Sequence, residues 1–267
     1  MMRAAAAPAG HDVPDARRVE EAGLNYLHSR RQLFHDGWVL FLSPGTAKRA
    51  RSVNAHFGST LPLAAKIAHC EALYGRHGLP ALFRITPFSQ PASLDAALAA
   101  RGYVAFGRTL VQCAALDAIV QRAATPDPAA GAELASPLPE AFVEAVGTMR
   151  GSTPAQRAAH LERIAQSPLA LVPIVARQDG ATVAAGMASV DGDLAGLFDI
   201  VTAPALRRRG LGTRVVQALV VRAWERGARH AFLQVEQHNR AALAIYRRFG
   251  FTTRYAYHYR VRPEEAP

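Results

Sequence analysis

The sequence predicts an α/β (α+β) fold in which one arrangement of helices and strands is used twice. Its 267 residues are enough for two domains of ordinary size. Apolar residues recur at helical spacing in some segments and form short β-prone runs in others. The segments 72–85 and 222–235 resemble each other, and Gly78 precedes Gly102 by 24 residues much as Gly227 precedes Gly250 by 23. We therefore expect a helix-strand-helix-strand unit in each half, the alternative being a chance likeness of two α/β segments.

The N-terminal domain is expected over 15–122, after a disordered leader over 1–14. Acidic residues after Asp15 indicate a helix start, and the apolar run 38–42 before a Ser-Pro-Gly turn indicates a strand. The basic, polar stretch 46–57 is typical of a loop. Further elements are a helix over 61–77 that ends at Gly78, a strand over 82–86, a helix over 91–101 and one or more strands over 103–116.

Between Asp117 and Pro139 the composition changes to Ala, Pro, Asp and Gly, which predicts a linker over 123–137 with the boundary near Pro126. The C-terminal domain, 138–267, should begin with two helices. Asp179-Gly180 and Asp191-Gly192-Asp193 predict tight turns between three strands. The expected elements are helices over 139–149 and 154–166, strands over 171–177, 182–190 and 194–202, a helix over 210–226, a strand over 231–236, a helix over 239–249 and a strand over 251–261.

Composition excludes several classes of protein. No apolar run reaches the length of a membrane-spanning helix, and the first ten residues lack a signal-peptide core, so we expect a cytoplasmic protein. Cys70 and Cys113 have no metal-ligand spacing, which favours buried thiols and no metal site. The charge of +10 comes from 31 basic and 21 acidic residues. Of the basic residues, only Lys48 and Lys66 are lysines, and the others are arginines. Because the arginines are scattered, a nucleic-acid partner is not favoured; a homo-oligomer remains open.

The stretch between Asp199 and Gly212 carries the strongest chemical signal. A strand leads through Ala203-Pro204 into Arg207-x-x-Gly210-x-Gly212, and a long helix follows at once. The first N–H groups of a helix lack intrahelical partners and carry partial positive charge. Glycines allow phosphate oxygens to approach this backbone, and the arginines add charge. The G-x-G-x-x-G pattern of dinucleotide folds and the G-K-[ST] of P-loops are both absent.

The loop resembles the [Q/R]-x-x-G-x-[G/A] signature of the GCN5-related N-acetyltransferase (GNAT) superfamily. Downstream residues strengthen the resemblance, which extends over about 170–261: Phe232-Leu233-Gln234-Val235, Asn239, Ala244-Ile245-Tyr246 and Phe249-Gly250-Phe251. It implies a mixed, mostly antiparallel sheet flanked by helices in each domain. It also implies acetyl-CoA as cosubstrate, with no metal, and an N-acetyltransferase that moves acetyl to a primary amine by direct attack in a ternary complex.

The same resemblance implies a role for each site residue. Tyr246 would be the general acid near the sulfur, although a helix residue packed on the sheet is the alternative. Asp199 and Glu236 are candidate bases, or ordinary polar residues. His258 could line the acceptor pocket, but an outward strand residue is favoured. The implied cofactor-binding residues are Ile200, Val201, Thr202, Arg207, Arg208, Arg209, Gly210, Leu211, Gly212, Thr213 and Asn239.

The N-terminal half departs from this pattern. Its corresponding segment, 54–60, has no R-x-x-G-x-G, so we expect a degenerate GNAT-like domain without the usual acetyl-CoA site. The basic segment 48–51 could close the acceptor site, but exposure to solvent is favoured. We expect a small-molecule amine acceptor. The alternative function is a non-catalytic module that binds or senses acyl-CoA.

Overall fold

The computed structural model describes residues 14–27, 31–43, 45, 47–123 and 132–266. The expected leader, apart from Pro14, and the centre of the expected linker lie outside these residues. Among the described residues, no helix combines the length and apolarity needed to cross a bilayer.

The strands form one continuous sheet with the order β1-β2-β3-β4-β11-β5-β10-β9-β8-β7-β6. Most neighbours are antiparallel, and the pairs β3/β4 and β9/β10 are parallel. The strands are β1 Gln32–His35, β2 Trp38–Phe41, β3 Val53–Asn54, β4 Phe83–Ile85, β5 Val104–Ala115, β6 Glu133–Ala135, β7 Ala170–Gln178, β8 Ala181–Asp191, β9 Leu194–Thr202, β10 His230–Glu236 and β11 Thr252–Val261.

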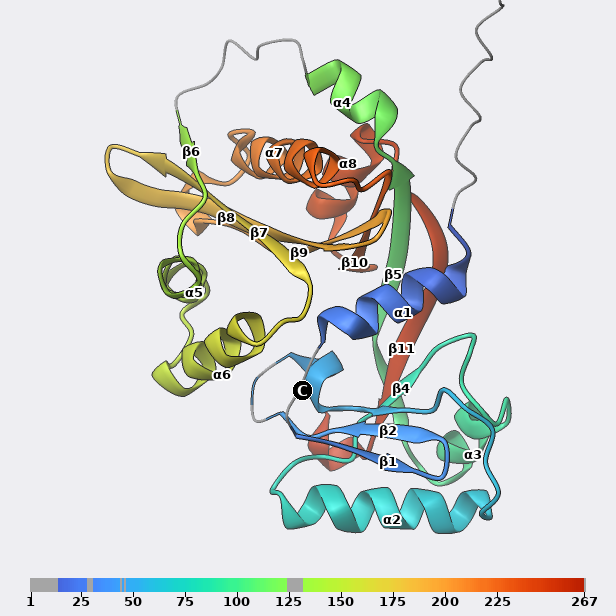
Figure 1. The fold of residues 1–267 in the computed structure, drawn as a ribbon. Coiled ribbons are helices and arrows are strands. Elements are labelled where there is room, and N and C mark those ends of the chain that lie inside the picture. Colours follow the sequence, from blue (N-terminus) through green and yellow to red (C-terminus); the bar gives the residue numbers. More distant parts are fainter. Residues whose placement is uncertain (1–13, 28–30, 44, 46, 124–131, 267) are drawn as a thin grey trace, which may run out of the picture.

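Eight α-helices are described, and they flank the sheet on both faces (Figure 1). The helices α7 and α8 lie beside the strands of the C-terminal half, whereas α2 and α3 lie beside those of the N-terminal half. They are α1 Ala16–Tyr26, α2 Leu63–Arg76, α3 Leu94–Ala100, α4 Asp117–Ala123, α5 Pro139–Arg150, α6 Pro154–Ala165, α7 Leu211–Glu225 and α8 Arg240–Arg248.

The expected helix-strand-helix-strand unit is present twice, as α2-β4-α3-β5 and α7-β10-α8-β11. The last strand of each unit is exchanged: β5 pairs with β10 of the C-terminal half, and β11 pairs with β4 of the N-terminal half. The two exchanged strands also pair with each other. The halves are thereby joined through the middle of the sheet, and neither sequence segment holds its full set of strands.

Three local predictions need correction. The stretch 46–57 is not only a loop, because it contains a 3-10 helix, Lys48–Arg51, and the short strand β3. The expected linker, 123–137, contains the last residue of α4, a helix that packs on α7, and the whole of β6, which pairs with β7. The strand β1 was missed, although the Asp36-Gly37 turn with positive φ angles of 44° and 82° is a hairpin signal.

Buried apolar side chains explain why the elements hold together. In the C-terminal half, Val215, Val216 and Leu219 of α7 pack on β8 and β9. In the N-terminal half, Trp38 and Tyr74 join the core beneath α2. The two cysteines are buried and free, as predicted. Burial raises the pKa of Cys113 to about 11.

Candidate active site

A cavity of about 1150 Å³ opens where the two halves meet. Its wall includes all of the predicted site residues except Arg209. The long strands β5 and β11 pass beside it, and α1, α5 and α6 supply further wall residues. The cavity therefore unites a strand-to-helix loop, two strand ends and a helix of the C-terminal half with a basic segment of the N-terminal half.

The central strands separate inside this cavity. β9 and β10 pair in parallel only as far as Leu197 and Leu233, yet β9 continues to Thr202 and β10 to Glu236. A β-bulge at this point shifts the β8/β9 register, and Asp199 has a φ of +54°. The β9 backbone from Phe198 onward thus presents its β10-facing edge to the cavity, where an extended ligand can accept and donate hydrogen bonds.

The loop before α7 is shaped to receive an anion. Gly210, the N-cap residue, has a φ of +79° and no side chain caps the helix. An added Cβ at Gly210 would meet nothing within 4 Å, and Leu211, Gly212 and Thr213 of the first turn of α7 line the cavity, so a ligand there can reach the start of this helix. Arg207 and Arg208 line the cavity beside them. These residues fit a pyrophosphate group through helix-terminal N–H groups and guanidinium charge.

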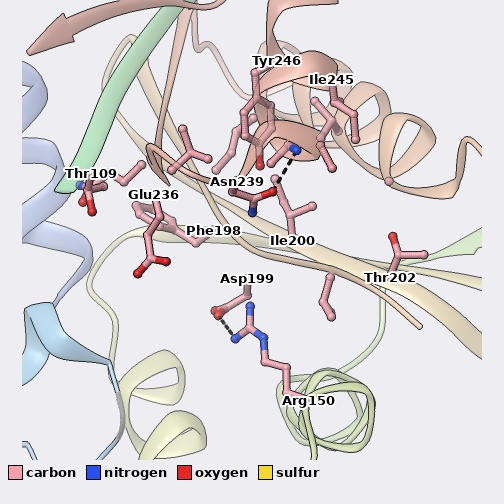
Figure 2. A pocket seen from close by; sticks show the side chains of 18 of the residues that line it. Thr109, Arg150, Phe198, Asp199, Ile200, Thr202, Glu236, Asn239, Ile245 and Tyr246 are labelled. Atoms are coloured by element: carbon pink, nitrogen blue, oxygen red, sulfur yellow. Dashed lines mark hydrogen bonds and ion pairs between the residues drawn. The ribbon is translucent and has the colours of Figure 1, made fainter. Parts of the chain in front are cut away.

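Tyr246 of α8 directs its hydroxyl into the cavity (Figure 2). The residue is 8% exposed, and its ring lies 5.9 Å from that of Phe251. Among the described residues, no group forms a hydrogen bond with this hydroxyl. Burial raises the pKa of Tyr246 to about 12, so the phenol stays protonated near neutral pH. The ring is packed in the core, as the alternative prediction for Tyr246 expected, while its hydroxyl remains available to a ligand.

Asn239 forms the N-cap of α8. Its Oδ1 accepts a hydrogen bond of 3.1 Å from the Ala242 backbone N–H (Figure 2). The residue also lines the cavity. Its amide Nδ2 is left to donate to a ligand, while the oxygen helps to start the helix that carries Tyr246.

The Asp199 carboxylate is held by several partners. Tyr26 donates to Oδ2 at 3.0 Å, Arg150 donates to Oδ1 at 2.8 Å and His160 lies 3.0 Å from Oδ2. Burial alone would raise its pKa, but the hydrogen bond with His160 and the charges of His160, Arg150 and Arg163 hold that pKa well below its usual range. A carboxylate stabilised in this way is a weak proton acceptor.

Glu236 lies at the end of β10, with its side chain 39% exposed. Lys48 donates to its Oε1 at 2.9 Å, and the His238 ring nitrogen lies 3.3 Å from Oε2. The preference for a solvated 48–51 segment was therefore wrong: Lys48 and Arg49 both line the cavity. His258 is not among the residues that line the cavity; its ring nitrogen instead lies 3.0 Å from Asp95 of α3, and its side chain is partly buried there.

Sequence reasoning missed the wall residues supplied by the other elements. Tyr26 stacks on Phe198 with ring centroids 3.6 Å apart, and Arg163 lies over Tyr26 at 5.6 Å. Tyr257 and Tyr259 come from the exchanged strand β11. Only Tyr257 and Tyr259 had a sequence signal, the alternating aromatic pattern over 255–259; the others depend on long-range packing.

Comparisons with known proteins show what the chain is similar to in sequence and in fold. The model of the acetyltransferase (GNAT) family matches residues 147–251. The chain is 27% identical over 249 residues to the uncharacterized N-acetyltransferase YobR of Bacillus subtilis (strain 168), covering 93% of this chain and 99% of that protein.

Two solved structures share the fold. A GCN5-related N-acetyltransferase from Kribbella flavida has a TM-score of 0.68 at 18% identity, over 94% of this chain and 96% of its own. A tandem GNAT protein from the clavulanic acid biosynthesis pathway has a TM-score of 0.60 at 18% identity, over 74% and 68% of the two chains. The family match is thus confined to residues 147–251, the segment that holds the glycine loop and Tyr246, while the likeness to solved structures extends the fold over most of the chain.

Proposed function

We propose that this GNAT-type acetyltransferase moves acetyl from acetyl-CoA to a primary amine by direct attack in a ternary complex. The observation that carries the proposal is the parting of β9 and β10 between an anion-binding loop and the free Tyr246 hydroxyl. The loop would hold the pyrophosphate, and the edge of β9 at Ile200, Val201 and Thr202 would hydrogen-bond the pantetheine arm. Acetyl-CoA would supply the activated acyl group.

The residues of the cavity have distinct parts in this proposal. Glu236 would accept a proton from the amine, directly or through water, while Lys48 holds its carboxylate in place. Tyr246 would donate its proton to the departing thiolate, since its raised pKa keeps that proton bound. Asp199 is assigned to positioning: it ties Arg150 and His160 to the β9 bulge.

A panel of amines tests the reaction class. Purified protein with acetyl-CoA and each amine should release free thiol above the rate without amine. If no amine raises thiol release while acetyl-CoA still raises the melting temperature, the chain is instead a module that binds acyl-CoA without transferring it.

Two matched substitutions separate the candidate bases. Glu236→Gln should lower kcat about 100-fold with little change in melting temperature, because the half-exposed carboxylate supplies a proton acceptor. Asp199→Asn should mainly reduce stability, by about 3 kcal/mol, because it leaves buried cations without their anion. The assignments would be exchanged if Asp199→Asn lost kcat at unchanged stability and Glu236→Gln retained it.

A further inference from the structure

The charged side chains of the cavity away from the α7 loop define its acceptor side. They are Lys48, Arg49, Arg150, Arg163, Asp199 and Glu236. Four are basic and two are acidic, which leaves an excess of two positive charges. The remaining basic wall residues, Arg207, Arg208 and Arg248, lie on the loop and on α8, beside the proposed pyrophosphate site.

On the acceptor side, three of the four basic residues face a carboxylate and the fourth, Arg49, does not. Lys48 pairs with Glu236 at 2.9 Å. Arg150 and Arg163 both face Asp199, at 2.8 Å and 3.7 Å. Among the described residues, no carboxylate pairs with Arg49. Its guanidinium carbon instead lies 5.4 Å from the centre of the Phe198 ring, the ring that stacks on Tyr26.

The Arg49 guanidinium also retains hydrogen-bonding capacity. Its Nη1 is buried from solvent without an acceptor among the described residues, and buried donors are normally satisfied. A guanidinium presents its N–H groups in a fork that matches carboxylate and phosphate oxygens. Because Arg49 lines the cavity and is only partly buried, its guanidinium can meet an oxyanion there, and Nη1 is a donor that no internal acceptor among the described residues satisfies.

The sign of the local charge restricts the acceptor further. An amine arrives largely as an ammonium ion, which a surplus of positive charge repels. An acceptor with only cationic groups is thus disfavoured on this wall, whereas a negative group elsewhere on the same molecule offsets the repulsion. Glu236 offers the amine a carboxylate, and Arg49 offers the oxyanion a guanidinium.

We infer that the acceptor is a primary amine that also carries an oxyanion, a carboxylate or a phosphate, and that Arg49 binds this group. The inference rests on the proposed acetyl transfer and adds the chemical class of the acceptor. Because Arg49 lies on the 3-10 helix of the N-terminal half, this half contributes to acceptor choice.

Matched acceptors test the charge requirement. Amino acids are compared with their carboxamides, which keep the shape and lose the negative charge, and glucosamine 6-phosphate is compared with glucosamine. Thiol release should favour the charged member of at least one kind of pair, and the two kinds distinguish a carboxylate from a phosphate. Preference for the uncharged member, or transfer only to polyamines, would overturn the inference while leaving the acetyltransferase assignment intact.

The role of Arg49 is tested with the preferred acceptor. Arg49→Gln should reduce kcat/KM by about 100-fold, chiefly through KM, and should abolish the preference within the pair. Arg49→Lys should recover part of the loss. Arg76→Gln, an exposed arginine on α2, serves as the matched control and should match the wild type.

Binding of acetyl-CoA separates this role from a role in cosubstrate binding. Its dissociation constant, measured by calorimetry, should be unchanged in Arg49→Gln. If that constant weakens as much as kcat/KM falls, Arg49 serves acetyl-CoA and the inference fails. If no amine of either kind is acetylated, the proposed function itself fails.

Discussion

The two halves place a helix N-terminus at corresponding points of the fold, and they use it differently. In the C-terminal half, β9 leads into α7 through Gly210, and the first residues of α7 line the cavity. In the N-terminal half, β3 leads to α2, and the backbone before the helix already binds an anion of this chain. The Asp36 carboxylate accepts hydrogen bonds from the N–H groups of Thr60 and Leu61 at 3.0 Å and 2.9 Å.

A second pair of positions differs in the same sense. The N–H of Phe251 donates to the Tyr246 carbonyl at 3.1 Å, and the N–H of Tyr103 donates to the Leu98 carbonyl, also at 3.1 Å. The helix ends match, but the phenol of one half is replaced by a buried leucine in the other. The comparison teaches that a repeated backbone can keep its geometry while the side chains at corresponding positions differ, as Tyr246 and Leu98 do.

The largest effect is expected from Gly210→Asp. A carboxylate at the mouth of α7 repels the pyrophosphate, so acetyl-CoA should bind more than about 100-fold more weakly by calorimetry. Gly210→Asn is the matched control, because asparagine tolerates the left-handed backbone conformation of Gly210 and, unlike aspartate, carries no charge. Equal affinities in the two variants would show that backbone strain, not charge, causes the loss.

Tyr246→Phe removes the hydroxyl, so that this position lacks a polar group as the corresponding Leu98 of the N-terminal half does. We expect kcat to fall about 100-fold, with the dissociation constant of acetyl-CoA nearly unchanged. Because the pKa of Tyr246 is about 12, the phenol stays protonated below that pH, and the loss should be equal at pH 7 and pH 9. A full rate in the variant would leave Tyr246 with a packing role only.

Asp36→Asn removes the internal anion of the N-terminal half. Backbone N–H groups of Leu61 and Thr60 hold the pKa of Asp36 below its usual range. Its contribution to stability is therefore present above the unfolded pKa of about 3.9 and is lost as pH falls below it. The melting temperature of the variant should be a few degrees lower than that of the wild type at pH 7, and this difference should shrink in acid.

Asp179→Asn is the control for that experiment, since Asp179 has a similar φ of 49° in the β7/β8 turn. It should leave the melting temperature nearly unchanged. A comparable loss in both variants would attribute the effect to the turn rather than to the anion before α2.

The smallest effect is expected within the arginine triplet. Arg207 lines the cavity and Arg209 does not. Arg207→Ala should weaken acetyl-CoA binding about 10-fold, the loss of one charged hydrogen bond, whereas Arg209→Ala should remain near the wild-type affinity. Equal losses would mean that the triplet acts by its summed charge.

Local signals made much of this architecture predictable from the sequence. The strand, glycine loop and helix from β9 to α7 follow from turn residues and apolar periodicity, and the Gly102 and Gly250 helix ends revealed the repeat. The exchange of β5 and β11 was not predictable, because the pairing partner of a strand depends on contacts far apart in sequence.

The candidate site divides in the same way. The loop and Tyr246 belong to one continuous motif. By contrast, the burial of Asp199 among Arg150, His160 and Tyr26 arises from three other helices. The placement of Lys48 beside Glu236 joins residues 188 positions apart, so charge and periodicity in the sequence favoured a solvated segment instead.

The number of acetyl-CoA molecules bound per chain tests the comparison most directly. Calorimetric titration of the full chain should give one site per chain in the wild type and in Asp36→Asn, and none in Gly210→Asp over the same concentration range. Two sites in the wild type, or one site that survives Gly210→Asp, would contradict the account, because the N-terminal half would then bind the cosubstrate.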